Sequence, residues 1–197
     1  VQLSSDRFQK NAQQHRESTT VVFSYPTDST LEIATAAIKA VKTIFRPGIK
    51  YKKAGVIQAR AMVPLDELLV KPNFKKAVKS FSASIKNGNG IIAEFKRKSP
   101  SAGQFNKCLI DDVLNTYKNN EVAGVSVLTD DHYFAGNLND LEKASNLNFA
   151  PVLRKDFIID EYQIFEAKAY GADAILLIAE ALDDYHATYL ATIAKSI

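Results

Sequence analysis

Short hydrophobic runs alternate with amphipathic segments along the later two thirds of the chain. The runs predict strands because they are continuous and rich in β-branched residues; they lie at Ile91–Phe95, Gly124–Thr129, Pro151–Arg154 and Ala174–Ile178. Segments with apolar residues at helical spacing follow them, and these cover Asp111–Asn119, Leu138–Ala144, Glu161–Tyr170 and Asp183–Lys195. Strands that alternate with helices predict βαβ units around a parallel sheet, either open or part of a barrel.

The first part of the chain has a different rhythm. A β-branched run at Ser18–Tyr25 predicts a strand, and apolar residues at helical spacing over 31–45 predict a helix. The segment Tyr51–Ile57 is interpreted as a second short strand. These elements bury too little apolar surface for a core of their own. Further on, the lysine-rich stretch Asn73–Ile85 predicts an amphipathic helix, with its lysines either solvated or attracting phosphate.

Composition excludes several classes of protein. The 197 residues are 46% hydrophobic and 24% charged, which is typical of one globular core with an appendage. A single Cys excludes a disulfide framework, and no Cys/His spacing is typical of zinc. No apolar run approaches the roughly 18 residues of a membrane span, and no secretory signal is recognisable, so we expect a cytoplasmic protein without membrane contact.

The net charge of +3 is unevenly distributed. Residues 1–57 contain nine Lys and Arg against four Asp and Glu, whereas the other residues contain 16 against 18. A basic excess in one part indicates that the two parts had different partners, although scatter in a short window gives the same numbers.

Charged residues stand at the carboxyl ends of the predicted strands. In α/β barrels this end forms the active site. The two-residue period of a strand places Glu94 and Lys96 on one face, and Lys155 follows the third strand. A carboxylate and an ammonium in one mouth can transfer protons or hold an anionic substrate. A salt bridge that closes the rim is the alternative, and the pattern leaves both open.

Four ordered blocks carry a family resemblance. Residues 91–103 (IIAEFKRKSPSAG), 127–136, 151–163 and 171–178 resemble the first four strands and loops of indole-3-glycerol phosphate synthase, and Val63–Leu69 resembles its amino-terminal extension. The resemblance covers about 60–197. It implies an α/β fold, an incomplete TIM (β/α)8 barrel of about four βα units. We therefore expect an extension at 58–89 and a half-barrel at 90–197, with a small α/β amino-terminal appendage.

The resemblance also implies an activity. The family is a lyase of tryptophan biosynthesis: it closes the ring of 1-(2-carboxyphenylamino)-1-deoxyribulose 5-phosphate, with loss of carbon dioxide and water. It uses neither a cofactor nor a metal, so the implied partner is one small phosphorylated substrate.

Matching residues take their implied roles from the family. Lys155 matches the general acid of ring closure, Lys96 a lysine that contacts the anionic groups of the substrate, and Glu94 its acidic neighbour. A serine near the substrate carboxylate and two aromatic residues around the anthranilate ring complete the set: Ser99, Phe134 and Phe157. Ordinary core packing is the alternative for the two phenylalanines.

The resemblance ends after the fourth helix. The family places its catalytic base on the fifth strand and its main phosphate-binding loops after the last two strands. We therefore expect the chain as given to be incomplete for catalysis. The two uncovered edges of a half-sheet favour pairing, so we also expect contact with a second copy.

Residues 1–57 carry a separate resemblance. The blocks Phe23–Thr30, Phe45–Gly48 and Tyr51–Val56 are similar to the little-finger region of UmuC-type Y-family DNA polymerases. That resemblance implies DNA contact through residues 46–53, which supply four cations: Arg46, Lys50, Lys52 and Lys53. No palm carboxylates accompany them, so polymerisation is excluded. An unrelated α/β appendage, or a fusion without activity, is the alternative.

Overall fold

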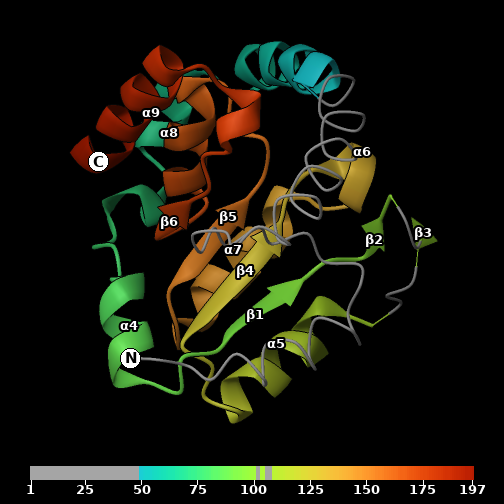
Figure 1. The fold of residues 1–197 in the computed structure, drawn as a ribbon, viewed down its shortest axis with the longest axis vertical. Helices are drawn as coiled ribbons and strands as arrows, with labels where there is room; N and C mark the ends of the chain where they lie inside the picture. Colours follow the sequence, from blue (N-terminus) through green and yellow to red (C-terminus); the bar gives the residue numbers. More distant parts are fainter. Residues whose placement is uncertain (1–48, 101–102, 105–107) are drawn as a thin grey trace, which may run out of the picture.

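The computed structural model describes residues 49–100, 103–104 and 108–197 (Figure 1). The strand predicted at 18–25, the helix predicted at 31–45 and Arg46 lie outside these residues. The described part contains a four-stranded parallel sheet in the order β1-β4-β5-β6. Its strands are β1 (Ile92–Phe95), β4 (Gly124–Leu128), β5 (Val152–Lys155) and β6 (Ala174–Ile175). The four strands predicted from hydrophobic runs are therefore confirmed, and they pair in chain order.

Helices connect the strands on one side of the sheet (Figure 1). The connecting helices are α5 (Ile110–Asn119), α7 (Leu138–Leu147) and α8 (Glu161–Ala169), and α9 (Asp184–Ser196) follows β6. Two shorter elements lie at strand ends, α6 (Asp131–Phe134) after β4 and η2 (Ala179–Ala181) after β6. The prediction of an incomplete (β/α)8 barrel with four βα units is confirmed, and the described strands do not close into a barrel.

Burial explains why the strands are continuous apolar runs. Every residue of β4 is buried, because neighbouring strands flank it and helices cover one of its faces. The main core lies between the sheet and the helices α5 and α7; its fully buried members include Phe95, Leu114, Val125, Val127, Leu141 and Val152. These buried side chains hold the strands of the sheet against the helices.

Residues 49–62 form one helix, so the strand predicted at Tyr51–Ile57 is wrong. Buried Val56 and half-buried Ala59 lie three positions apart and pack with Tyr162 and Ala169 of α8. A spacing of three is helical, and this contact decides between two patterns that a seven-residue window leaves ambiguous. The helix also runs through the boundary that we expected between residues 57 and 58.

The stretch Asn73–Ile85 is not one helix either. It contains η1 (Pro72–Lys75) and the first part of α4 (Phe81–Asn87), and the short helix α3 (Leu65–Leu69) precedes it. Two hydrogen bonds accompany the break. The Ser80 side chain caps α4 by accepting a hydrogen bond from the backbone N–H of Ala83 at 3.1 Å. The backbone N–H of Lys79 donates to Asp173 at 2.7 Å, which ties this segment to the residue before β6.

The loop after β1 is tied to a connecting helix. Arg97 forms a two-pronged ion pair with the buried Asp140 of α7, and its guanidinium lies 4.9 Å from the centre of the Phe95 ring. Two short antiparallel strands follow, β2 (Lys98–Ser99) and β3 (Gly103–Gln104). These contacts hold the carboxyl end of β1 in place.

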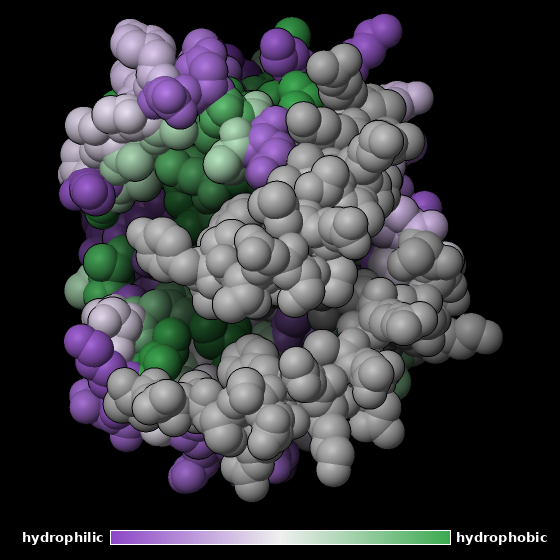
Figure 2. Space-filling view, viewed as in Figure 1, coloured by the Kyte–Doolittle hydropathy of each residue, from purple (hydrophilic) through white to green (hydrophobic). Residues whose placement is uncertain are grey.

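Hydrophobic and hydrophilic surface are segregated on the face of the molecule shown in Figure 2, which has the same view as Figure 1. Among the described residues that this view shows, hydrophobic ones gather toward the inner part of the coloured area and most hydrophilic ones lie at its outer rim. In the described part of the chain, no helix has the length and apolar character needed to cross a membrane.

Candidate active site

The carboxyl ends of β1 and β5 bring two of the predicted site residues into contact. Lys155 Nζ lies 2.6 Å from Glu94 Oε2, although β4 separates the two strands. The register explains the reach, since Glu94 pairs with Ser126 of β4 and Ser126 pairs with Leu153, two residues before Lys155. Side chains two residues apart lie on the same face of a strand, so Glu94 and Lys155 meet over the same side of the sheet.

Lys96, the residue that follows β1, also contacts Glu94. Its Nζ lies 3.7 Å from Glu94 Oε1, so one carboxylate lies between two ammonium groups. The contact of Lys155 is a short charge-assisted hydrogen bond, whereas that of Lys96 is an ion pair beyond hydrogen-bond distance. All three side chains are about one fifth exposed. Among these three side chains two are ammonium groups and one is a carboxylate, and all three are partly accessible, which suits them to an anionic ligand.

The other three predicted residues lie in the loops that follow β1, β4 and β5. Ser99 is 2% exposed on β2. Phe134 is the half-buried last residue of α6. Phe157 is buried two residues after β5, and the ring of Tyr133 meets its ring edge-on at 6.2 Å between centroids. The three residues therefore occupy separate loops at the same end of the sheet.

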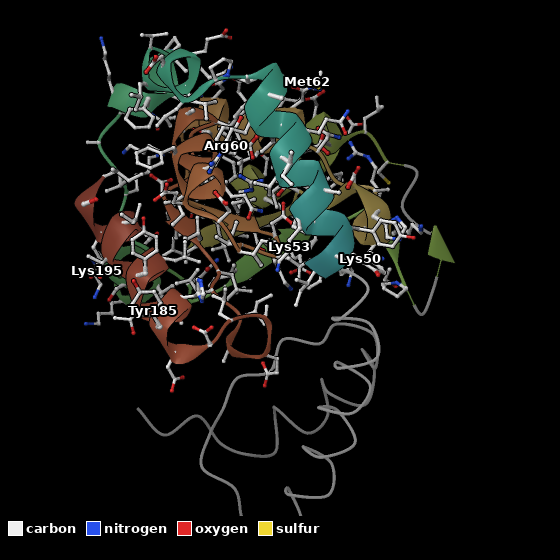
Figure 3. All side chains as sticks on the ribbon, turned by 90° about the horizontal axis from the view of Figure 1, so that it is seen from above. Lys50, Lys53, Arg60, Met62, Tyr185 and Lys195 are labelled. Atoms are coloured by element: carbon white, nitrogen blue, oxygen red, sulfur yellow. The ribbon has the colours of Figure 1, made fainter. Side chains whose placement is uncertain are left out.

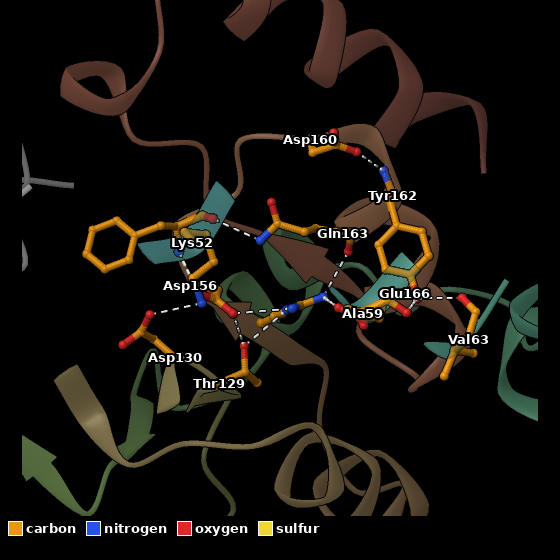
Figure 4. Close-up of polar contacts among 12 residues, drawn as sticks. Lys52, Ala59, Val63, Thr129, Asp130, Asp156, Asp160, Tyr162, Gln163 and Glu166 are labelled. Atoms are coloured by element: carbon orange, nitrogen blue, oxygen red, sulfur yellow. Dashed lines mark hydrogen bonds and ion pairs between the residues drawn. The ribbon is translucent and has the colours of Figure 1, made fainter. Parts of the chain in front are cut away.

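A buried ionic network beneath these loops was not predicted from the sequence. Arg154 of β5 contacts the Asp156 carboxylate at 3.2 Å, and the Thr129 hydroxyl donates to the same carboxylate at 2.6 Å (Figure 4). Arg154 also donates to the Gln163 carbonyl and pairs with Glu166 of α8, both at 2.9 Å. These contacts tie the ends of β4 and β5 to α8.

Asp156 is the centre of this network. Burial on its own raises the pKa of the Asp156 carboxyl, but Arg154 and Lys52 outweigh burial and hold that pKa below its ordinary value of 3.8. The carboxylate is therefore charged in the folded protein at neutral pH. Its charge is compensated by side chains from two different elements.

Lys52 is another residue of this network that was not predicted from the sequence. Its Nζ extends from the helix 49–62 and lies 2.6 Å from Asp156 and 2.9 Å from Asp130. Burial on its own lowers the pKa of Lys52, but the two carboxylates outweigh burial and raise it. Its ammonium is thus engaged with two carboxylates inside the molecule, and DNA contact through residues 46–53 stays a prediction. Lys50 and Lys53 are exposed on the same helix (Figure 3).

The sequence contained a signal for the two carboxylates that Lys52 contacts. Asp130 and Asp156 each stand just past a strand, where the barrel rule places functional groups. The sequence contained no such signal for Lys52, because the pattern around it predicts a strand of the amino-terminal appendage. Within the described ranges, no three His, Cys, Asp or Glu residues are grouped so that they could hold a metal ion.

Comparison with known proteins assigns the chain to a family. The family model for indole-3-glycerol phosphate synthase matches residues 47–197. The chain belongs to the indole-3-glycerol phosphate synthase family. The match begins before the expected residue 60, so the whole helix 49–62, including Lys52, lies in the part that matches the family.

Curated relatives agree with the family model. Indole-3-glycerol phosphate synthase of Alkaliphilus metalliredigens is 41% identical over 137 residues, which are 68% of this chain and 52% of that protein. The synthase of Clostridium kluyveri is 44% identical over 61% of this chain and 46% of its own length. That of Bacteroides thetaiotaomicron is 38% identical over 72% of this chain and 55% of its own length. The chain thus spans about half the length of the curated relatives it matches.

Proposed function

We propose that this chain provides the acid and substrate-carboxylate side of an indole-3-glycerol phosphate synthase active site. The reaction is the decarboxylating ring closure of 1-(2-carboxyphenylamino)-1-deoxyribulose 5-phosphate in tryptophan biosynthesis. One observation supports it above the others: two lysines, Lys96 and Lys155, flank Glu94 in an accessible cluster at the carboxyl end of the sheet. Membership in the family supports this choice of substrate.

Lys155 is the proposed general acid. Ring closure joins the ring carbon that bears the carboxylate to the carbonyl carbon of the sugar chain, and the carbonyl oxygen must gain a proton as the bond forms. Lys155 Nζ donates that proton. The bond between the ring carbon and the carboxyl carbon then breaks, carbon dioxide leaves, and the electron pair of that bond restores the aromatic ring. The new hydroxyl takes up a proton and leaves as water, while the adjacent CH2 group gives up a proton to a base and the carbon–carbon double bond forms. The 2.6 Å contact with Glu94 orients the ammonium for the first of these steps.

The remaining groups are proposed to bind the substrate. Lys96 offsets the negative charge of the substrate carboxylate, with Ser99 nearby, and Phe134 and Phe157 border the aromatic ring. Two ammonium groups around one carboxylate, in a partly buried site, favour an anionic ligand over a neutral one. The base and the main phosphate loops that the resemblance implies fall on later strands of the barrel, outside the described residues.

Ligand binding tests this proposal without requiring turnover. The probe is 1-(2-carboxyphenylamino)-1-deoxyribitol 5-phosphate, the reduced substrate, whose anthranilate group is fluorescent. We expect saturable binding that weakens about tenfold or more, or about 1.4 kcal/mol, in Lys96→Ala and Lys155→Ala. The matched control is Lys118→Ala, which removes an exposed lysine of α5. Absence of binding, or equal weakening by all three substitutions, would contradict the proposal.

A further inference from the structure

One ammonium joins two strand ends and a helix. Lys52 Nζ contacts Asp130, which follows β4, and Asp156, which follows β5, from the helix 49–62 that lies over them (Figures 3 and 4). The side chains of Lys52, Asp130 and Asp156 are only 12%, 4% and 1% exposed. Water therefore screens these ion pairs weakly, and the two carboxylates share this cation.

Each of these carboxylates orders the segment that bears a proposed substrate contact. Asp130 caps α6 by accepting a hydrogen bond from the backbone N–H of Tyr133 at 2.7 Å, and α6 ends with Phe134. Asp156 accepts from the backbone N–H of Phe157 at 2.8 Å and directly follows Lys155. Through its two contacts, Lys52 fixes the position of one loop relative to the other.

Other contacts already attach the helix itself. The Tyr162 hydroxyl donates to the carbonyl of Val63 at 2.8 Å and to that of Ala59 at 3.1 Å, and Arg60 pairs with Asp160 at 2.6 Å. Val56 adds a buried apolar contact against α8. All of these lie on the carboxyl-terminal side of Lys52. The helix therefore has attachments that do not involve Lys52, and the particular effect of Lys52 lies at the two strand ends.

The charges of the two strand ends are compensated unequally without Lys52. Asp156 keeps Arg154 at 3.2 Å and the Thr129 hydroxyl, but Arg154 also pairs with Glu166. Among the ion pairs of the described residues, that of Asp130 is with Lys52. Loss of the ammonium would leave Asp130 as a buried carboxylate beside a second one, an arrangement that favours displacement of α6.

We propose that Lys52 is a positioning residue of the active site, which holds the α6 loop and the segment after β5 in register by bridging Asp130 and Asp156. The claim that Lys52 orders the two strand ends is argued from geometry alone. The consequence for the substrate rests on the proposed function.

Amide hydrogen exchange tests the bridge. The variant is Lys52→Met, and the matched control is Lys53→Met, an exposed neighbour on the same helix with the same change in charge. We expect the amides of Tyr133 and Phe157 to exchange about tenfold faster in Lys52→Met only, while Val125 and Val127 of β4 keep their rates. Lys52→Arg, which keeps the charge, restores part of the protection. Unchanged rates at both amides, or equal acceleration at Val125 and Val127, would overturn the proposal.

Binding of the reduced substrate separates the two proposals. We expect Lys52→Met to weaken binding about tenfold and Lys53→Met to leave it unchanged. Equal binding by wild type and Lys52→Met would overturn positioning of the active site. If wild type does not bind the probe at all, the proposed function fails, and the exchange rates alone decide whether Lys52 orders the two strand ends.

Discussion

Lys155 and Glu94 form a 2.6 Å hydrogen-bonded ion pair across an intervening strand. Ser126 of that strand lies beneath them and its hydroxyl is 3.5 Å from the same carboxylate oxygen. A small residue at this position of β4 leaves room for the two longer side chains to meet. The pair is therefore a product of the register among three parallel strands.

Removal of the Glu94 carboxylate should separate binding from chemistry. Glu94→Gln leaves Lys96 and Lys155 without their shared anion, so the reduced substrate should bind a few-fold more tightly because the site becomes more positive. Orientation of the acid is lost, so product formation should fall about 100-fold in an assay that completes the barrel. Glu67→Gln, at an exposed position of α3, is the control. Weaker binding by Glu94→Gln would contradict a role of the two lysines in anion binding.

Asp156 should matter more for stability than any exposed acid. Asp156→Asn removes the anion that Lys52 and Arg154 share, and we expect the free energy of unfolding to fall by about 3–5 kcal/mol, as for other broken buried pairs. Asp111→Asn breaks the exposed pair with Lys143 and should cost less than about 1 kcal/mol. Urea unfolding measures both values, and similar losses would mean that the buried network is not important for stability.

Low pH should decrease the free energy of unfolding, because it protonates the Asp156 carboxyl. Because the folded-state pKa of Asp156 lies below 3.8, its contribution to stability is complete above that pH and declines as the pH falls toward the folded-state pKa. The groups around it are Lys52, Arg154 and Asp130. Measured from about pH 6 to pH 3, the free energy of unfolding should decline more steeply for wild type than for Asp156→Asn. Parallel curves would contradict this assignment.

The edges of the sheet give a prediction about assembly. Among the described strands, β1 and β6 each pair with one neighbour, and Ile92 of β1 is 44% exposed. We expect the chain to pair with a second copy in size-exclusion chromatography, and Ile92→Lys to shift it toward the monomer. A wild-type monomer at all concentrations would contradict pairing.

The sheet and the lysine–carboxylate cluster were predictable because each depends on local pattern. Parallel strands are buried and therefore continuous in sequence, and a two-residue period placed Glu94 and Lys96 together. The helix 49–62 was not predictable, because the residues around Val56 fit a strand or a helix until α8 packs against them. The contacts of Lys52 were not predictable either. Its partners lie 78 and 104 positions later in the chain, and no local pattern indicates a contact at that separation.

Complementation of the barrel tests the central claim most directly. The chain is mixed with a polypeptide that carries the remaining half of the Alkaliphilus metalliredigens synthase, and formation of indole-3-glycerol phosphate is followed by its fluorescence. We predict product from the mixture with wild type or Lys118→Ala, and a rate lower by about 100-fold or more with Lys155→Ala. Equal rates with wild type and Lys155→Ala, or no product from the wild-type mixture, would contradict the assignment of the acid to this chain.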